Sequence, residues 1–125
     1  MMIMLDYKDT RPIYEQVVEK FQTLILKGVL EPDAQLPSVR SLAVELSINP
    51  NTIQRAYGEL ERQGFIYTVK GRGGFVRYHE DLMEVRKERL KKQLSEILTE
   101  ARELNIPVQE LLDGCETELT GERLT

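Results

Sequence analysis

Apolar residues recur with a period close to 3.6 residues in three stretches of the first half of the chain, which predicts three amphipathic helices. We expect these helices over Pro12–Gly28, Ser38–Leu46 and Pro50–Gln63, with Gly64 ending the third. The segment Val29–Gln35 between the first two is expected to be a loop with a Pro-Asp turn. The side chains expected to form a shared core are Ile13, Val17, Phe21, Leu24, Ile25, Val39, Leu42, Ala43, Leu46, Ile53, Ala56, Tyr57 and Leu60.

The second and third expected helices each begin with a capping signal. Ser38 follows a proline and can cap the second helix, while Asn49 precedes Pro50, a residue that suits the first helical position. Only Ser47 and Ile48 lie between the two helices, which leaves room for a tight turn and nothing more. Two short helices joined in this way form a helix-turn-helix, whose second helix can enter the major groove of DNA.

After Gly64 the pattern changes from helical to extended. The runs Phe65–Val69 and Phe75–Tyr78 are rich in β-branched and aromatic residues, and the glycine-rich segment Lys70–Gly74 separates them. Such a pair of runs predicts a β-hairpin. Three helices followed by a hairpin form a winged helix-turn-helix, with the glycine-rich turn as the tip of the wing.

The last third of the chain is charged and strongly helical from Asp81 to Asn105, and a short helix is expected over Val108–Leu112, ended by Gly114. A helix of about 24 residues would be roughly 36 Å long, more than a domain this small can cover. The spacing of its apolar residues resembles a short coiled-coil seam, so we expect it to mediate dimerisation. The seam consists of Met83, Leu90, Leu94, Ile97, Ala101 and Leu104.

The fold class expected is therefore mostly α with a small β-hairpin. A winged helix-turn-helix domain is predicted over residues 10–79, a two-helix dimerisation segment over residues 80–114, and a flexible polar tail over residues 115–125.

The net charge of −4 argues against a general nucleic-acid binder, but the charge is unevenly distributed. Residues 1–80 carry ten basic and ten acidic side chains, whereas residues 81–125 carry seven basic and eleven acidic ones, which accounts for the −4. Residues 62–77 contain basic side chains and no acidic one, so the predicted wing can present a local basic patch on a neutral domain.

Candidate DNA-binding residues cluster at the two helix starts and at the wing. A surface arginine is ordinarily just solvated, but Arg40 lies in the first helix of the helix-turn-helix, near the start of the second, and its guanidinium matches guanine O6 and N7. Polar side chains on the third helix suit phosphates and base edges, and Arg72 between two glycines suits a narrow minor groove. The candidates are Ser38, Arg40, Asn51, Thr52, Gln54, Arg55, Lys70, Gly71, Arg72 and Gly73.

Other kinds of site find little support. His79 and Cys115 are single copies, whereas a metal site needs several ligands and a nucleophile needs a base, so we expect no metal, cofactor or catalysis. The lone cysteine suits a reducing compartment. No apolar run is long enough to cross a membrane and no signal peptide is evident, so we expect a cytoplasmic protein.

Several ordered motifs closely resemble the GntR family of bacterial transcriptional regulators. They are Pro12-Ile13-Tyr14-Glu15-Gln16, Leu36-Pro37-Ser38-Val39-Arg40-Ser41-Leu42-Ala43, Asn49-Pro50-Asn51-Thr52, Ala56-Tyr57-Gly58-Glu59-Leu60 and Gly71-Arg72-Gly73-Gly74-Phe75-Val76. The short C-terminal part looks like that of the YtrA subfamily.

This resemblance implies a homodimer that represses transcription from a palindromic operator, and an operon for a transporter as its target. It implies that Arg40 reads bases, that Thr52–Arg55 lies in the recognition helix, and that Gly71–Gly73 enters the minor groove. Many family members have arginine where this chain has Pro50 and Gln54, so the operator sequence stays open. Asp33 occupies a position that is often glycine in the family, which should matter only to the turn.

Two other functions were weighed. A winged helix can serve as a protein-interaction module that does not bind DNA, and a lack of preference for an operator over random DNA at moderate salt would favour that alternative. A regulator fused to a pyridoxal-phosphate enzyme domain does not fit 125 residues. The small-molecule effector is unknown, and the C-terminal segment is too small to enclose a ligand by itself, so we expect any effector at the dimer interface.

Overall fold

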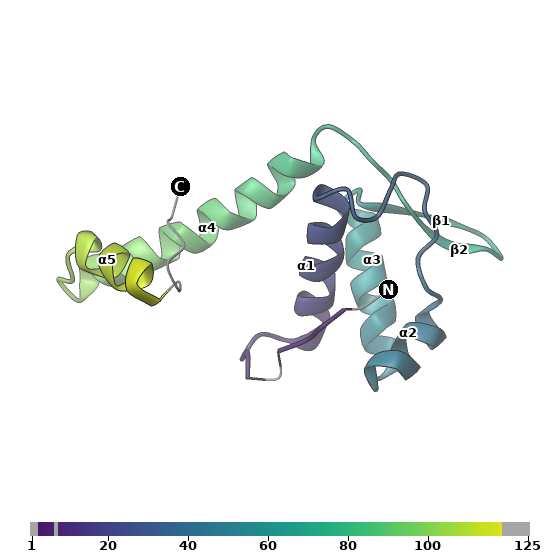
Figure 1. Ribbon diagram of the computed structural model, residues 1–125, viewed down its shortest axis with the longest axis horizontal. Coiled ribbons are helices and arrows are strands. Elements are labelled where there is room, and N and C mark those ends of the chain that lie inside the picture. Colours follow the sequence, from purple (N-terminus) through teal and green to yellow (C-terminus); the bar gives the residue numbers. More distant parts are fainter. Residues whose placement is uncertain (1–2, 7, 119–125) are drawn as a thin grey trace. The chain divides into compact units, whose positions relative to one another are not determined.

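The computed structural model describes residues 3–6 and 8–118 and confirms a mostly helical fold with one hairpin (Figure 1). The elements are α1 (Ile13–Leu26), α2 (Val39–Leu46), α3 (Pro50–Arg62), β1 (Ile66–Val69), β2 (Gly73–Val76), α4 (Leu82–Glu103) and α5 (Val108–Glu118). The chain divides into two compact units, residues 1–86 and 87–125. The boundary lies within α4, whereas the sequence pattern had placed it between residues 79 and 80.

The helix-turn-helix forms as the capping signals predict. The Ser38 Oγ accepts a hydrogen bond from the Ser41 N–H at 3.0 Å at the start of α2, and the Asn49 Oδ1 accepts one from the Asn51 N–H at 2.8 Å at the start of α3. Ser47 ends α2 in the left-handed conformation, with φ 55°. The Ile48 N–H then donates to the Ala43 carbonyl, which closes the turn between the two helices.

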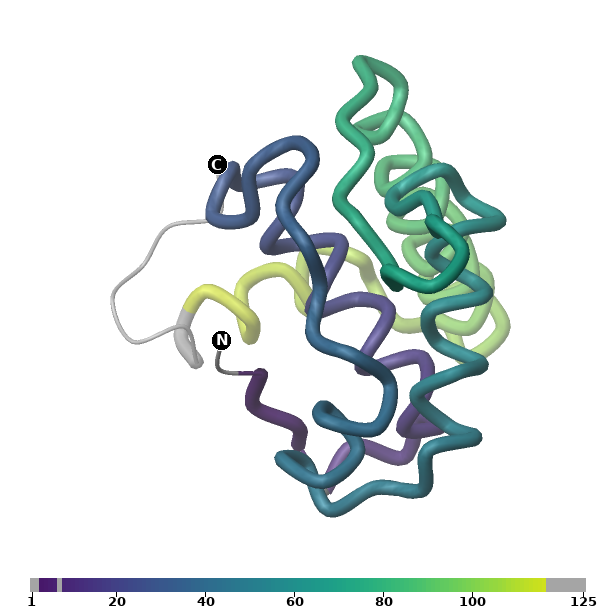
Figure 2. Tube along the Cα trace, turned by 90° about the vertical axis from the view of Figure 1, so that its right-hand side faces the viewer, coloured from purple at the N-terminus to yellow at the C-terminus, as the bar shows by residue number. Residues whose placement is uncertain are grey.

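The connection from α1 to α2 is more ordered than the loop predicted for Val29–Gln35. It leads from the end of α1 past the hairpin (Figure 1) to the start of α2 (Figure 2), and its last residues pair with β2. The Asp33 and Leu36 N–H groups donate to the carbonyls of Val76 and Gly74, each at 2.8 Å. The predicted loop with a turn at Pro32–Asp33 is confirmed, and these backbone groups and an isolated bridge between Gln35 and Phe75 attach its end to the β1–β2 sheet.

Asp33 adopts the left-handed conformation, with φ 66°, as expected at a position that glycine often occupies. Its role extends beyond the turn, because its Oδ1 accepts a hydrogen bond from the Tyr67 hydroxyl at 2.8 Å. This hydrogen bond stabilises the protonated hydroxyl and is the main reason why the pKa of Tyr67 is raised. Asp33 thus ties the connection to the hairpin.

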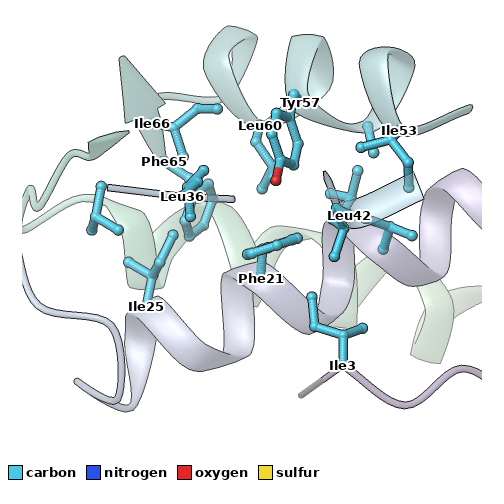
Figure 3. Close-up of a cluster of buried hydrophobic side chains, with 14 of the residues drawn as sticks. Ile3, Phe21, Ile25, Leu36, Leu42, Ile53, Tyr57, Leu60, Phe65 and Ile66 are labelled. Atoms are coloured by element: carbon cyan, nitrogen blue, oxygen red, sulfur yellow. The ribbon is translucent and has the colours of Figure 1, made fainter. Parts of the chain in front are cut away.

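The core of the first unit lies between α1, α2, α3 and the hairpin (Figure 3). All four apolar positions predicted for α3 are buried, and Phe21 of α1 packs edge-on against Tyr57 with ring centroids 5.7 Å apart. Other predicted core positions are only half-buried, because they lie at the edges of their helices. These are Ile13, Leu24, Val39 and Leu46.

Two glutamines of α1 are buried although the hydrophobic pattern assigned them no place in the core. Gln16 accepts a hydrogen bond from the Asp6 N–H at 3.0 Å, and Gln22 donates one to the Gln63 side chain at 2.5 Å. Their polar groups are tolerated inside because both are hydrogen-bonded.

The first turn of α4 belongs to the first unit. Leu82 is buried in its core, and the Arg86 guanidinium donates to the Thr23 hydroxyl at 3.0 Å and lies 3.6 Å from a Glu19 carboxylate oxygen. These contacts explain why the unit ends at residue 86.

The second unit differs from the sequence prediction at its end. Helix α5 continues past Leu112, through Gly114 and Cys115, to Glu118, because a lone glycine lowers helical stability by only about 1 kcal/mol. The tail predicted over residues 115–125 is therefore helical at its start, and residues 119–125 lie outside the described residues. No helix in the described part of the chain combines the length and apolarity needed to cross a bilayer.

Gly58 offers a direct test of local stability. It lies within α3 in helical conformation, and a Cβ built there would meet no atom within 4 Å. Gly58→Ala is expected to raise the free energy of unfolding by about 0.5–1 kcal/mol, because alanine loses less backbone entropy in a helix. Urea denaturation followed by circular dichroism measures this change. Gly28→Ala is the matched control, since its surroundings are equally open but its φ of +76° penalises a side chain, and it should destabilise.

Candidate nucleic-acid interface

The outer face of α3 carries the polar side chains that the sequence assigned to DNA. Asn51, Gln54 and Arg55 are exposed, and Thr52 is half-buried at the border of the face. No acidic residue lies in the first turn of α3, so the positive end of the helix dipole is not offset there. This end of α3 can therefore receive phosphate groups.

The start of α2 lies beside α3 because the Tyr57 hydroxyl donates to the Pro37 carbonyl at 2.8 Å. Burial raises the pKa of this hydroxyl, which keeps it protonated as a donor. Arg40, in the first turn of α2, is exposed and makes no ion pair within the described residues. Ser38 has its hydroxyl engaged with Ser41, so its first role is to cap the helix.

The wing tip is shorter than the predicted turn. Val69 pairs with Gly73, so Gly73 belongs to β2 and the connection consists of Lys70, Gly71 and Arg72. Gly71 and Gly73 have φ of +78° and +94°, conformations that favour glycine. Lys70, Gly71, Arg72 and Gly73 are exposed, so the basic side chains of the tip are accessible.

Gln35 fixes this tip from outside the hairpin. Its side-chain nitrogen donates to the Arg72 carbonyl at 2.7 Å, 37 residues along the chain. Sequence reasoning missed this contact, because a glutamine in a predicted loop carries no signal of a partner so distant.

A shallow groove of about 210 Å³ separates the outer face of α3 from the hairpin. It is open to solvent and brings together residues from α2, α3 and both strands. The lining residues are Pro37, Ser38, Val39, Gln54, Tyr57, Gly58, Glu61, Thr68, Gly73 and Gly74. Of the predicted DNA-binding residues, Ser38, Gln54 and Gly73 lie in it. Gly58 lies on the polar face that the helical period predicts for α3, and Thr68 is an addition that the sequence did not suggest.

Acidic side chains limit the interface towards the end of α3. The Arg62 guanidinium donates a hydrogen bond to the Glu59 carboxylate, and this bond is the main reason why the pKa of Glu59 is lowered to about 2. Glu61 is exposed and lines the groove. A carboxylate repels phosphate, so the first two turns of α3 are better suited to DNA than its end.

Arg55 is held by an aromatic ring. Its guanidinium carbon lies 3.7 Å from the centroid of the Tyr14 ring, in the first turn of α1. Sequence reasoning placed Arg55 in the interface but gave Tyr14 no role there, because no local pattern connects residues 41 positions apart. Among the described residues, no group of three or more histidine, cysteine or acidic side chains could hold a metal ion.

Helices α1–α3, the tight turn between α2 and α3, and the β1–β2 hairpin define a winged helix-turn-helix protein. The sequence profile described as "Bacterial regulatory proteins, gntR family" matches residues 13–76. The chain belongs to the GntR family of transcriptional regulators, which are not enzymes.

Relatives extend the similarity beyond the DNA-binding domain. The HTH-type transcriptional repressor YtrA of Bacillus subtilis (strain 168) is 38% identical over 112 residues, which cover 88% of this chain and 86% of the relative. A GntR family transcriptional regulator from Listeria monocytogenes superposes with a TM-score of 0.68 at 38% identity, covering 87% of this chain and 96% of its own. The chain is thus a YtrA-like member of the family.

One similar structure contains DNA. The DNA-binding domain of AraR in complex with operator ORE1 is 33% identical, with a TM-score of 0.52, and the alignment covers 61% of this chain and 93% of that domain.

Proposed function

We propose that this chain is a repressor that binds a palindromic operator as a homodimer in the cytoplasm. In this proposal the start of α3 and Arg40 enter the major groove, while the tip of the wing enters the adjacent minor groove. The observation that carries it is a set of accessible basic side chains at the start of α2 and at the wing tip, which form no ion pair among the described residues. Residues next to them in the sequence line one groove together with the polar face of α3. By family expectation, the target is an operon for a transporter.

Arg40 is the residue proposed to read bases. It is exposed, no carboxylate neutralises it within the described residues, and its helix is fixed to α3 through Tyr57. An arginine held in this way can present both of its terminal nitrogens to guanine O6 and N7. The wing is proposed to add minor-groove contacts through Arg72, which the Gln35 side chain supports from behind.

The second unit is proposed to form the dimer. Among its described residues only Ala101 is a buried side chain, while large apolar side chains lie exposed along α4 and α5. A helix with so little burial of its own gains stability from a partner. The exposed positions are Leu90, Leu94, Ile97, Leu98, Leu104, Val108 and Leu112, and Met83 precedes them on α4.

Ala101 needs a correction to its predicted place in the seam. It is only 3% exposed within the single chain, and its carbonyl accepts a hydrogen bond from the Ile106 N–H at 2.8 Å in the turn after α4. A side chain already covered in this way adds little area to a dimer. We therefore propose a seam centred on Leu90, Leu94 and Ile97.

Selection of bound sequences from random DNA tests the proposal. A palindromic motif with half-sites about one helical turn apart, bound with steep salt dependence, is the expected result. Recovery of no motif, with equal binding to all duplexes at moderate salt, would instead favour a protein-interaction module.

Arg40→Ala is expected to lower the affinity for the recovered operator by about 1–3 kcal/mol while leaving the fold intact, because one bidentate base contact is lost. Fluorescence anisotropy with the labelled operator measures the effect. Lys27→Ala, at the exposed end of α1, removes one positive charge outside the interface and is the matched control. Unchanged affinity of a folded Arg40→Ala variant would remove this residue from the interface.

A further inference from the structure

Tyr14 and Arg55 form a contact that the DNA-binding role alone does not explain. Tyr14 lies in the first turn of α1, half-buried against the core, and the Arg55 guanidinium stacks on its ring at 3.7 Å. Arg55 itself is exposed on the polar face of α3. The contact therefore joins the start of α1 to the face proposed to meet DNA.

The way Arg55 is held differs from that of the arginines with structural roles. Arg11 is paired with Asp9 and Glu19, and Arg62 is paired with Glu59, so a carboxylate offsets each charge. Arg55 forms no salt bridge with any described residue and rests on a neutral ring, and the Glu59 carboxylate, which is hydrogen-bonded by Arg62, interacts with it only through the longer-range charge effect that helps lower the Glu59 pKa. Its orientation is restrained while its positive charge stays available to an anion.

The position of the Arg55 guanidinium over the Tyr14 ring suits a phosphate ligand. A guanidinium that lies on an aromatic face keeps its N–H groups in its own plane, so they can still donate sideways to two oxygens of one phosphate. A free arginine loses side-chain entropy when it is fixed, and the ring restrains much of that motion before binding.

We propose that Tyr14 is a positioning residue, which holds the Arg55 guanidinium ready for a phosphate of the operator backbone. This inference rests on the proposed function, because it presumes that the polar face of α3 meets DNA. Tyr14, at the start of α1, would then contribute to DNA binding through Arg55 and without touching the DNA itself.

A double-mutant cycle tests the inference on the whole 125-residue chain, with the operator duplex recovered by selection. Tyr14→Leu is expected to weaken binding about three- to fivefold, the scale of one partly exposed cation–π contact. Arg55→Ala is expected to weaken it more, and Tyr14→Leu should then have no further effect in the Arg55→Ala background. Tyr14→Phe keeps the ring and should bind within about twofold of the unmodified chain.

Two further measurements separate positioning from a purely structural role. Arg55→Ala should reduce the slope of log affinity against log salt by about 0.9, as the loss of one phosphate contact predicts. Arg55→Lys keeps the charge but lacks the planar group, so it should bind more weakly and depend less on the residue at position 14 than Arg55 does. If thermal unfolding shows that Tyr14→Leu lowers stability, the Arg55→Lys variant, which leaves Tyr14 in place, provides the test instead.

The outcomes that overturn the inference are distinct from failure of the proposed function. Equal losses from Tyr14→Leu in the presence and absence of Arg55, or an unchanged salt slope in Arg55→Ala, would refute the positioning role while DNA binding stands. If the unmodified chain selects no DNA sequence, the proposed function fails and this inference fails with it.

Discussion

Ile97→Asp is expected to convert the proposed homodimer into a monomer and to lower operator affinity by a factor of about 10² to 10⁴. Ile97 is 55% exposed in the single chain and lies seven residues from both Leu90 and Leu104 on the same face of α4. A carboxylate there would have to be buried opposite its counterpart in the partner, at a cost that the seam cannot offset. The affinity falls because two linked DNA-binding domains gain effective concentration that separate domains lack.

Sedimentation velocity and fluorescence anisotropy with the recovered operator measure the two effects. Thr99→Asp adds the same charge on the opposite face of α4, where it is exposed, and should leave both the dimer and its affinity unchanged. Leu90→Asp should repeat the effect of Ile97→Asp. A dimer that persists in both seam variants would show that α4 is not the interface.

Phe21→Ala is expected to lower the free energy of unfolding of the first unit by about 3–5 kcal/mol. The ring is completely buried, and it packs edge-on against Tyr57 of α3, whose hydroxyl holds the start of α2. Truncation leaves a cavity that α1 and α3 cannot close without moving the helix-turn-helix. Loss of the fold, and with it of operator binding, is therefore expected near physiological temperature.

Urea denaturation followed by circular dichroism measures this loss. Val29→Ala, at a side chain that is 64% exposed, removes apolar atoms outside the core and should change stability by less than about 0.5 kcal/mol. A loss below about 1 kcal/mol in Phe21→Ala would mean that the packing of α1 on α3 is not what holds the domain together.

Local signals in the sequence were sufficient for most of the first unit. Ser38 and Asn49 mark the starts of α2 and α3 because a cap satisfies backbone groups within three residues of itself. The buried face of α3 follows from its helical period, and the two β-rich runs around glycine predict the hairpin. Weak stop signals were less reliable, since Gly114 does not end α5 and Gly73 belongs to a strand.

The sequence by itself determined the winged helix-turn-helix and the residues that carry positive charge on it, because periodicity and capping act over a few neighbouring residues. Only the tertiary structure decided which side chains support them. Gln35 reaches the wing, Gln22 meets Gln63, and Tyr14 stacks on Arg55 across separations of 37 and 41 residues. Such contacts depend on how helices and strands pack together, and a single polar or aromatic residue bears no local mark of its distant partner.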